Sequence, residues 1–175
     1  IERCFDPIPS REFFKEEENK KIGIIGTETT VNSGMYVKLI QELLPDAQVI
    51  GKACPLFVPL VEEGFKKHPV TEQIIDFYLS SFKESEIDAL ILGCTHYPLL
   101  LNQIEKAVPS GVRVLTQGDI VAASLEDYLS RHPEIDSLCS RGGTIRFLTT
   151  ESVEKFASSA SIFLNQPIIA EHITL

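Results

Sequence analysis

A cysteine, a threonine and a histidine follow the most strand-like run of the sequence, at Cys94, Thr95 and His96. That run, residues 89–93, is apolar, and Pro98 beyond it suits the first turn of a helix. Ligands bind outside the carboxyl ends of strands in open parallel sheets. Free backbone N–H groups at a helix N-terminus and a nearby histidine both favour the thiolate form of a cysteine. Cys94 is therefore predicted to be a reactive base or nucleophile.

The same position is compatible with an inert thiol, because free cysteines are among the most buried residue types. Position alone leaves the functional and the packing interpretations of Cys94 equally open. Cys4, Cys54 and Cys139 lack the combined context of Cys94, a strand end with a helix N-terminus and a nearby histidine, so the packing interpretation is favoured for them. Cys94 and His96 could form a pair of zinc ligands, but no further ligand cluster lies near them, so no metal is expected.

Two further loops carry groups that could hold a substrate. Residues 22–26 form a short apolar run, and a hydroxyl-rich turn from Thr27 to Thr30 follows it. Such a loop can bind a carboxylate or a phosphate, and either threonine could equally cap the next helix. Glu62 and Glu63 lie in a third loop, where one carboxylate could face inward, although adjacent acids usually form a solvated surface.

The elements that must position these loops alternate between strands and helices. Strands are predicted at residues 22–26, 47–54, 89–93, 112–115, 144–148 and 168–174. Helices are predicted at residues 33–44, 55–64, 71–83 and 119–129, from Pro98 onwards, and at 151–164. This alternation predicts a parallel α/β sheet with helices on both faces. A linker is expected at residues 132–143, with the part beyond residue 118 forming a tail that needs another surface to pack on.

Composition narrows the class of protein. The 43% apolar and 23% charged residues are typical of a globular protein. A net charge of −9 disfavours nucleic acid and anionic membranes as partners. No stretch approaches the roughly 20 apolar residues of a spanning helix, and the four cysteines lack a C-x-x-C pair, so a cytoplasmic location is expected. The chain begins with Ile1 instead of methionine, which suggests a fragment or a processed product.

Four segments carry recognisable motifs: residues 24–31 with Ser33 and Tyr36, residues 53–62, residues 92–100 and residues 147–175. In this order they resemble a Gly-Thr-x-x-Thr loop, an acid-bearing Cys-Pro loop, a Gly-Cys-Thr-His-Tyr-Pro signature and the C-terminus of one family. That family is the glutamate racemases, within the aspartate/glutamate racemase family. The segments follow the order that the family has.

The resemblance implies a fold and a reaction. Residues 21–118 would form a complete flavodoxin-like parallel-sheet domain, after an incoming segment at 1–20. Residues 119–175 would be the C-terminal part of a second such domain. The family interconverts L- and D-glutamate without pyridoxal phosphate, metal or other cofactor, and supplies D-glutamate for peptidoglycan. Two thiols face opposite sides of the α-carbon, one removing its proton and the other delivering a proton.

The resemblance also implies roles for single residues. Cys94 would be the base that acts on L-glutamate, and His96 would tune or assist it. Glu62 matches an acid that assists the site without exchanging the α-proton. The threonines that would lie near the substrate are Thr27, Thr30 and Thr95. A homodimer is expected because the family often dimerises.

The sequence also departs from the family. The Asp-Ser strand end and the Ala-Cys-Asn-Thr loop, which supplies the second thiol, do not occur in these 175 residues. Cys54 does not replace that thiol, because Pro55 follows it in a loop already matched. The chain is therefore expected to carry one of two bases and to be inactive alone. The alternatives are an aspartate or hydantoin racemase, a non-catalytic module that binds an anion or docks on a full-length racemase, and a cysteine hydrolase with a Cys94–His96 dyad that lacks an orienting residue.

Overall fold

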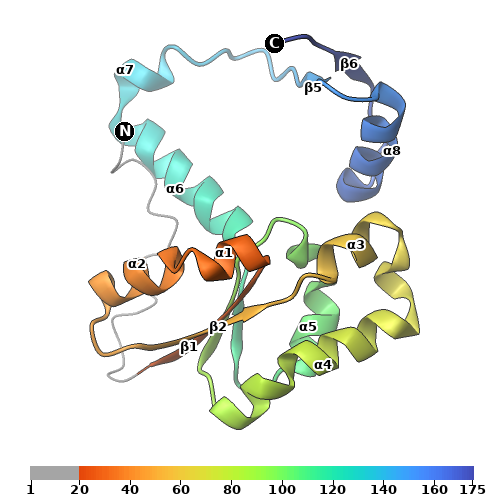
Figure 1. The fold of residues 1–175 in the computed structure, drawn as a ribbon. Coiled ribbons are helices and arrows are strands. Elements are labelled where there is room, and N and C mark those ends of the chain that lie inside the picture. The colour runs from red at the N-terminus through yellow and green to blue at the C-terminus, as the bar shows by residue number, and fades with distance from the viewer. Residues whose placement is uncertain (1–19) are drawn as a thin grey trace. The chain divides into compact units, whose positions relative to one another are not determined.

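The computed structural model describes residues 20–175 (Figure 1). The chain divides into two compact units, the first extending to Arg131 and the second comprising His132–Leu175. Cys4 and almost all of the predicted incoming segment, residues 1–20, lie outside the described residues. Among the residues that are described, no helix is both long enough and apolar enough to cross a membrane.

A four-stranded sheet forms the centre of the first unit. Its strands are β1 (Lys21–Gly26), β2 (Gln48–Ala53), β3 (Ala89–Leu92) and β4 (Arg113–Leu115). The order is β2-β1-β3-β4, and every neighbouring pair is parallel. The predicted parallel α/β fold is confirmed, with strands in the order of a flavodoxin-like sheet. Such a sheet has a switch point between β1 and β3, because the chain continues from these two strands in opposite directions.

Helices cover both faces of this sheet, with α1 and α2 on one face and α4 and α5 on the other (Figure 1). The helices of the first unit are α1 (Glu28–Asn32), α2 (Met35–Leu43), α3 (Phe57–Glu62), α4 (Pro69–Ser85), α5 (Leu101–Ala107) and α6 (Gln117–Arg131). Two short 3₁₀ helices, η1 (Phe65–Lys67) and η2 (Tyr97–Leu100), precede α4 and α5. Most predicted helices are confirmed, with ends displaced by a few residues.

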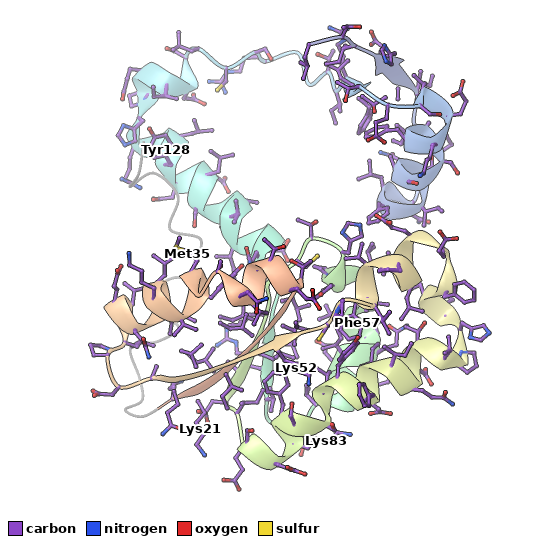
Figure 2. The ribbon with its side chains drawn as sticks, in the orientation of Figure 1. Lys21, Met35, Lys52, Phe57, Lys83 and Tyr128 are labelled. Carbon is purple, nitrogen blue, oxygen red and sulfur yellow. The ribbon has the colours of Figure 1, made fainter. Side chains whose placement is uncertain are left out.

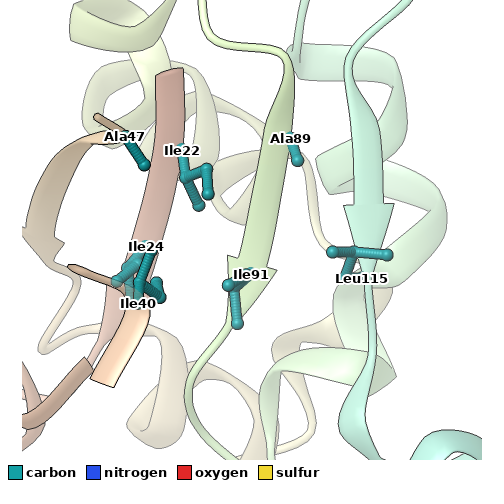
Figure 3. Packing of buried hydrophobic residues seen from close by; sticks show 7 residues of the cluster. All are labelled: Ile22, Ile24, Ile40, Ala47, Ala89, Ile91 and Leu115. Carbon is teal, nitrogen blue, oxygen red and sulfur yellow. The ribbon is translucent and has the colours of Figure 1, made fainter. Parts of the chain in front are cut away.

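The two faces of the sheet explain the apolar runs of its central strands. One face forms a buried cluster with α2 (Figure 3), whose members are Ile22, Ile24, Ile40, Ala47, Ala89, Ile91 and Leu115. On the other face, a β-carbon at Gly23 would lie within 3.0 Å of both Phe82 and Leu90. Both faces of β1 and β3 are therefore buried, which favours continuous apolar runs over alternation.

Aromatic packing connects the loops that follow β2 and β3. Phe57, at the start of α3, is fully buried (Figure 2). Its ring meets those of Tyr78 and Tyr97 edge to face, with centroids 5.4 and 5.1 Å apart, an arrangement that stabilises by about 0.5–1.5 kcal/mol per pair. The hydroxyl of Tyr97 donates to the carbonyl oxygen of Cys54 at 2.9 Å. The loop after β3 is thereby attached to the loop after β2.

The second unit contains two parallel strands connected by one helix, with a further short helix before them. Its elements are α7 (Pro133–Asp136), β5 (Phe147–Thr149), α8 (Val153–Leu164) and β6 (Ala170–His172). Strands β5 and β6 are parallel, and the Ser152 hydroxyl caps α8. Helix α7 falls inside the segment predicted as a linker, because Pro133 suits a first helical turn. Ile145 and Ile169 remain 75% and 89% exposed, so this unit leaves apolar surface uncovered.

Candidate active site

The loops that follow β1 and β3 lie side by side at the carboxyl edge of the first unit's sheet. Ile25 of β1 pairs in register with Leu92 of β3. The N–H of Gly93 donates to the carbonyl oxygen of Ile25 at 2.7 Å, so pairing continues one residue beyond β3 and fixes the backbone before Cys94. This edge is the switch point of the sheet, where open α/β sheets bind ligands.

Cys94, His96 and Glu62 form a row at this edge. The Sγ of Cys94 lies 3.9 Å from Nδ1 of His96, and Nε2 of His96 lies 3.1 Å from Oε1 of Glu62. The Glu62 carboxylate reaches the row from the last residue of α3. The His96 side chain is 24% exposed and that of Glu62 is 54% exposed. The structure thus brings together three residues of which the outermost two, Glu62 and His96, are 34 positions apart in the sequence.

Glu62 determines which ring nitrogen of His96 carries a proton. A carboxylate only accepts hydrogen bonds, so Nε2 must donate to it. In the neutral ring, Nδ1 then presents a lone pair to the thiol of Cys94 and can accept its proton. The imidazolium that results lies between a thiolate and a carboxylate, and both negative charges stabilise it. The row can therefore generate a thiolate.

A pocket of about 210 Å³ adjoins the thiol. The residues that line it come from the end of β3, the loop after it, η2 and the start of α6. They are Leu92, Gly93, Cys94, Thr95, Pro98, Gln117 and Gly118. Because α6 begins at Gln117, the pocket is bordered by a helix N-terminus, where backbone N–H groups favour negative charge.

The threonines of the first loop are engaged with each other. Thr27 caps α1, its hydroxyl oxygen accepting from the N–H of Thr30 at 3.3 Å, and the two hydroxyl oxygens are 3.0 Å apart. The helix-capping interpretation is confirmed for Thr27, whereas Thr30 lies inside α1. The prediction of a turn at residues 27–30 is wrong, because α1 begins at Glu28, directly after its cap. Thr95, by contrast, lines the pocket beside Cys94.

The other thiols differ from Cys94 in their surroundings. Cys54 is fully buried, and burial raises the pKa of its thiol to about 12, so it remains a neutral packing group as predicted. The packing prediction for Cys139 is wrong. That thiol is exposed, because it follows the short helix α7, in a segment with no buried residues around it.

Two further histidines, His68 and His132, lie outside the row. Nδ1 of His68 accepts from the N–H of Val70 and caps α4. His132 lies 3.0 Å from Glu134 at the surface. Within residues 20–175 no group of three or more His, Cys, Asp and Glu side chains is placed to hold a metal ion.

Sequence reasoning missed Gln117. Its Nε2 donates to the hydroxyl of Tyr36 and, at 3.3 Å, to the carbonyl oxygen of Leu92. Tyr36 belongs to the first of the four segments that resemble the family. A signal for Gln117 did exist, since it comes two residues after the end of β4 and the carboxyl ends of parallel strands share one edge.

The first unit is thus a doubly wound α/β domain with a thiol, an imidazole and a carboxylate in a row at its switch point. The chain belongs to the Asp/Glu/Hydantoin racemase family, whose model matches residues 12–125.

Known racemases match most of the chain in sequence and in structure. The glutamate racemase of Chlorobaculum parvum is 45% identical over 112 residues, covering 64% of this chain and 41% of that protein. The crystal structure of the RacE1 isoform of glutamate racemase from Bacillus anthracis matches with a TM-score of 0.83 and 30% identity, covering 98% of this chain and 64% of that one. Glutamate racemase from Francisella tularensis, solved in complex with D-glutamate, matches with a TM-score of 0.75 and 31% identity, covering 94% and 60%. The chain spans less than two thirds of each of these proteins.

Proposed function

We propose that this chain carries one half of the active site of a cofactor-independent glutamate racemase. The observation that supports this most directly is the Cys94–His96–Glu62 row beside a pocket at the sheet edge. The family match and the glutamate racemases among the relatives favour glutamate as the substrate. The product would be D-glutamate for peptidoglycan, made in the cytoplasm. A homodimer remains the expected assembly.

Cys94 acts as the base for L-glutamate in this proposal. His96 takes the thiol proton, and the thiolate then removes the α-proton of the substrate. A second thiol on the opposite face of the α-carbon delivers a proton, so one proton leaves and one arrives in each turnover. The α-proton of an amino acid is weakly acidic, so donors must stabilise the negative charge that develops. Thr95 and the loop with Thr27 and Thr30 would supply such donors.

The second thiol is proposed to come from the part of the family that this chain does not span. Cys54 is unsuited, because it is buried and its Sγ faces the carbonyl oxygen of Lys52 at 3.7 Å. Residues 119–175 are proposed to complete the domain that carries the missing thiol. Their exposed apolar residues, such as Ile145 and Ile169, are what an uncovered packing surface would show. Helix α6, however, belongs to the first compact unit.

A cysteine hydrolase is the second candidate, and Glu62 is the observation that favours it. A Cys–His dyad needs a third group to orient the imidazole, and Glu62 contacts His96 at 3.1 Å. The family match favours the racemase over this candidate. An aspartate or hydantoin racemase would use the same row, so it differs from the first proposal only in substrate.

The test uses one fused polypeptide. It joins this chain to the part of Bacillus anthracis RacE1 that this chain does not span. Circular dichroism follows the conversion of L-glutamate to D-glutamate, with L-aspartate in parallel. We expect conversion of glutamate, loss of conversion in Cys94→Ala, and retention in Cys139→Ser, whose thiol is exposed and in the other unit. A folded fusion that hydrolyses esters but leaves glutamate unchanged would favour the hydrolase.

A further inference from the structure

Gln117 contacts the backbone before Cys94 from the end of the loop that follows β4. It is the first residue of α6, just beyond β4, and it borders the same pocket as Cys94. Its Nε2 donates to the carbonyl oxygen of Leu92 at 3.3 Å and to the hydroxyl of Tyr36. A carbonyl oxygen can only accept, so the amide nitrogen must face Leu92, which fixes the orientation of the amide.

Tyr36 joins this amide to the next residue of the loop. A β-carbon at Gly93 would lie 3.5 Å from Cε2 of Tyr36 and 2.9 Å from the carbonyl oxygen of Ile25. The Tyr36 ring and β1 therefore close off the space beside Gly93. Gln117 thus holds Leu92 directly and holds the ring that packs against Gly93.

The far end of the loop is also fixed. The Tyr97 hydroxyl donates to the carbonyl oxygen of Cys54 at 2.9 Å. The loop is therefore held at Gly93 and at Tyr97, and only residues 94–96 lie between them. Within this segment, the Sγ of Cys94 lies 3.9 Å from Nδ1 of His96. Hydrogen bonds weaken steeply as distance increases, so a small shift at the end of β3 would separate the thiol from the imidazole.

We propose that Gln117 is a positioning residue for Cys94, whose amide holds the end of β3 so that the thiol stays within reach of His96. Gln117 acts through Leu92 and Tyr36, not on the substrate. The inference rests on the proposed function only in taking Cys94 as the reactive thiol. Alkylation of that thiol needs no turnover, so its outcome is separate from the outcome of the racemase assay.

The experiment measures the rate of Cys94 alkylation by iodoacetamide between pH 5 and 10. The full chain carries Cys4→Ser and Cys139→Ser, and mass spectrometry confirms the modified site. Gln117→Met keeps the length of the side chain and removes both donated hydrogen bonds. The matched control is Gln103→Met, because Nε2 of Gln103 also donates to a backbone carbonyl, that of Lys66 at 2.7 Å, and does not line the pocket.

Titratable groups of three residues lie near the thiol of Cys94 or its partner His96. His96 lies beside the thiol, and Glu62 lies on the far side of His96. The hydroxyl of Tyr97 interacts with the charge of Cys94, and burial raises its pKa above the range of the experiment. The His96→Gln variant therefore tests whether the imidazole contributes to the alkylation profile.

The midpoint of the profile is the pH at which the alkylation rate is half of its maximum. We expect Gln117→Met to raise this midpoint by about one pH unit, a tenfold change in thiolate at a given pH. His96→Gln should raise the midpoint by the same amount. The double variant Gln117→Met/His96→Gln should raise it no further than either single variant, and Gln103→Met should leave it unchanged. A parental midpoint in Gln117→Met would overturn the proposal, and so would a profile that does not respond to His96→Gln. If Gln117→Met fails to unfold cooperatively, Tyr36→Phe takes its place. That variant keeps the ring and removes the acceptor, so it should shift the midpoint in the same direction by less, and an unchanged midpoint would again overturn the proposal.

Discussion

Replacing Gly93 by alanine should destabilise the sheet where β1 and β3 meet. The new β-carbon would lie 2.9 Å from the carbonyl oxygen of Ile25, closer than van der Waals contact allows. A backbone carbonyl in a central strand cannot rotate away as a side chain can, so the strands must separate. Their separation also weakens the 2.7 Å hydrogen bond from the N–H of Gly93 to Ile25.

These two effects set the expected magnitude. Overpacking a close contact costs about 1–3 kcal/mol, and weakening one buried hydrogen bond costs about 1 kcal/mol. We therefore expect Gly93→Ala to lower the free energy of unfolding by about 2–4 kcal/mol. For a chain of this size, such a loss lowers the melting temperature by at least about 4 °C.

Gly118→Ala is the matched control, since both glycines line the pocket. A β-carbon at Gly118 would meet nothing within 4 Å, and alanine in a helix stabilises by about 0.5–1 kcal/mol relative to glycine. Urea unfolding followed by far-ultraviolet circular dichroism gives both free energies. A Gly93→Ala variant as stable as the parent would refute the close approach of β1 and β3 at this residue.

Three further outcomes follow from the same structure. Tyr97→Phe should lower the free energy of unfolding by only about 0.5–1.5 kcal/mol, because the carbonyl oxygen of Cys54 keeps a second donor, the N–H of Phe57 at 3.2 Å. Urea unfolding measures the loss. A loss above about 3 kcal/mol, twice the upper estimate, would contradict this expectation. Burial raises the pKa of Cys54 from 9.0 to about 12, so the folded state keeps a proton that the unfolded state loses, and stability should fall between pH 9 and 12 by up to about 1.4 kcal/mol per pH unit. Cys54→Ala should flatten that decline, and equal slopes in the two proteins would count against a buried neutral thiol. The exposed apolar residues of the second unit predict self-association, which light scattering would detect, whereas a stable monomer would argue against it.

The sheet could be predicted from sequence because its signal is local. Residues 22–26 and 89–93 are continuous apolar runs of strand length, which is what burial on both faces requires. The turns that follow them are therefore placed at one edge by topology alone. The prediction of a reactive loop at Cys94 used this rule, and the structure places His96 and Glu62 in contact there.

Other features depend on contacts that the sequence does not encode locally. The polar segment after β1 was predicted as a turn because its hydroxyl groups suit both turns and caps, and only the hydrogen bond from Thr30 to Thr27 distinguishes them. The exposure of Cys139 follows from the lack of a core around α7, which its own residue type does not indicate. Gln117 is 81 positions from Tyr36, so its contact requires the strand order of the sheet.

The most direct test of the account follows the α-proton of L-glutamate by ¹H NMR in D₂O, using the fusion with the unspanned part of Bacillus anthracis RacE1. If Cys94 is the base for L-glutamate, deuterium should replace the α-proton in the parent fusion. In Cys94→Ser the exchange from L-glutamate should be slower by at least about 100-fold, the lower end of what a positioned base contributes. Exchange from L-glutamate at the parental rate in Cys94→Ser would contradict the central claim that this thiol removes the proton.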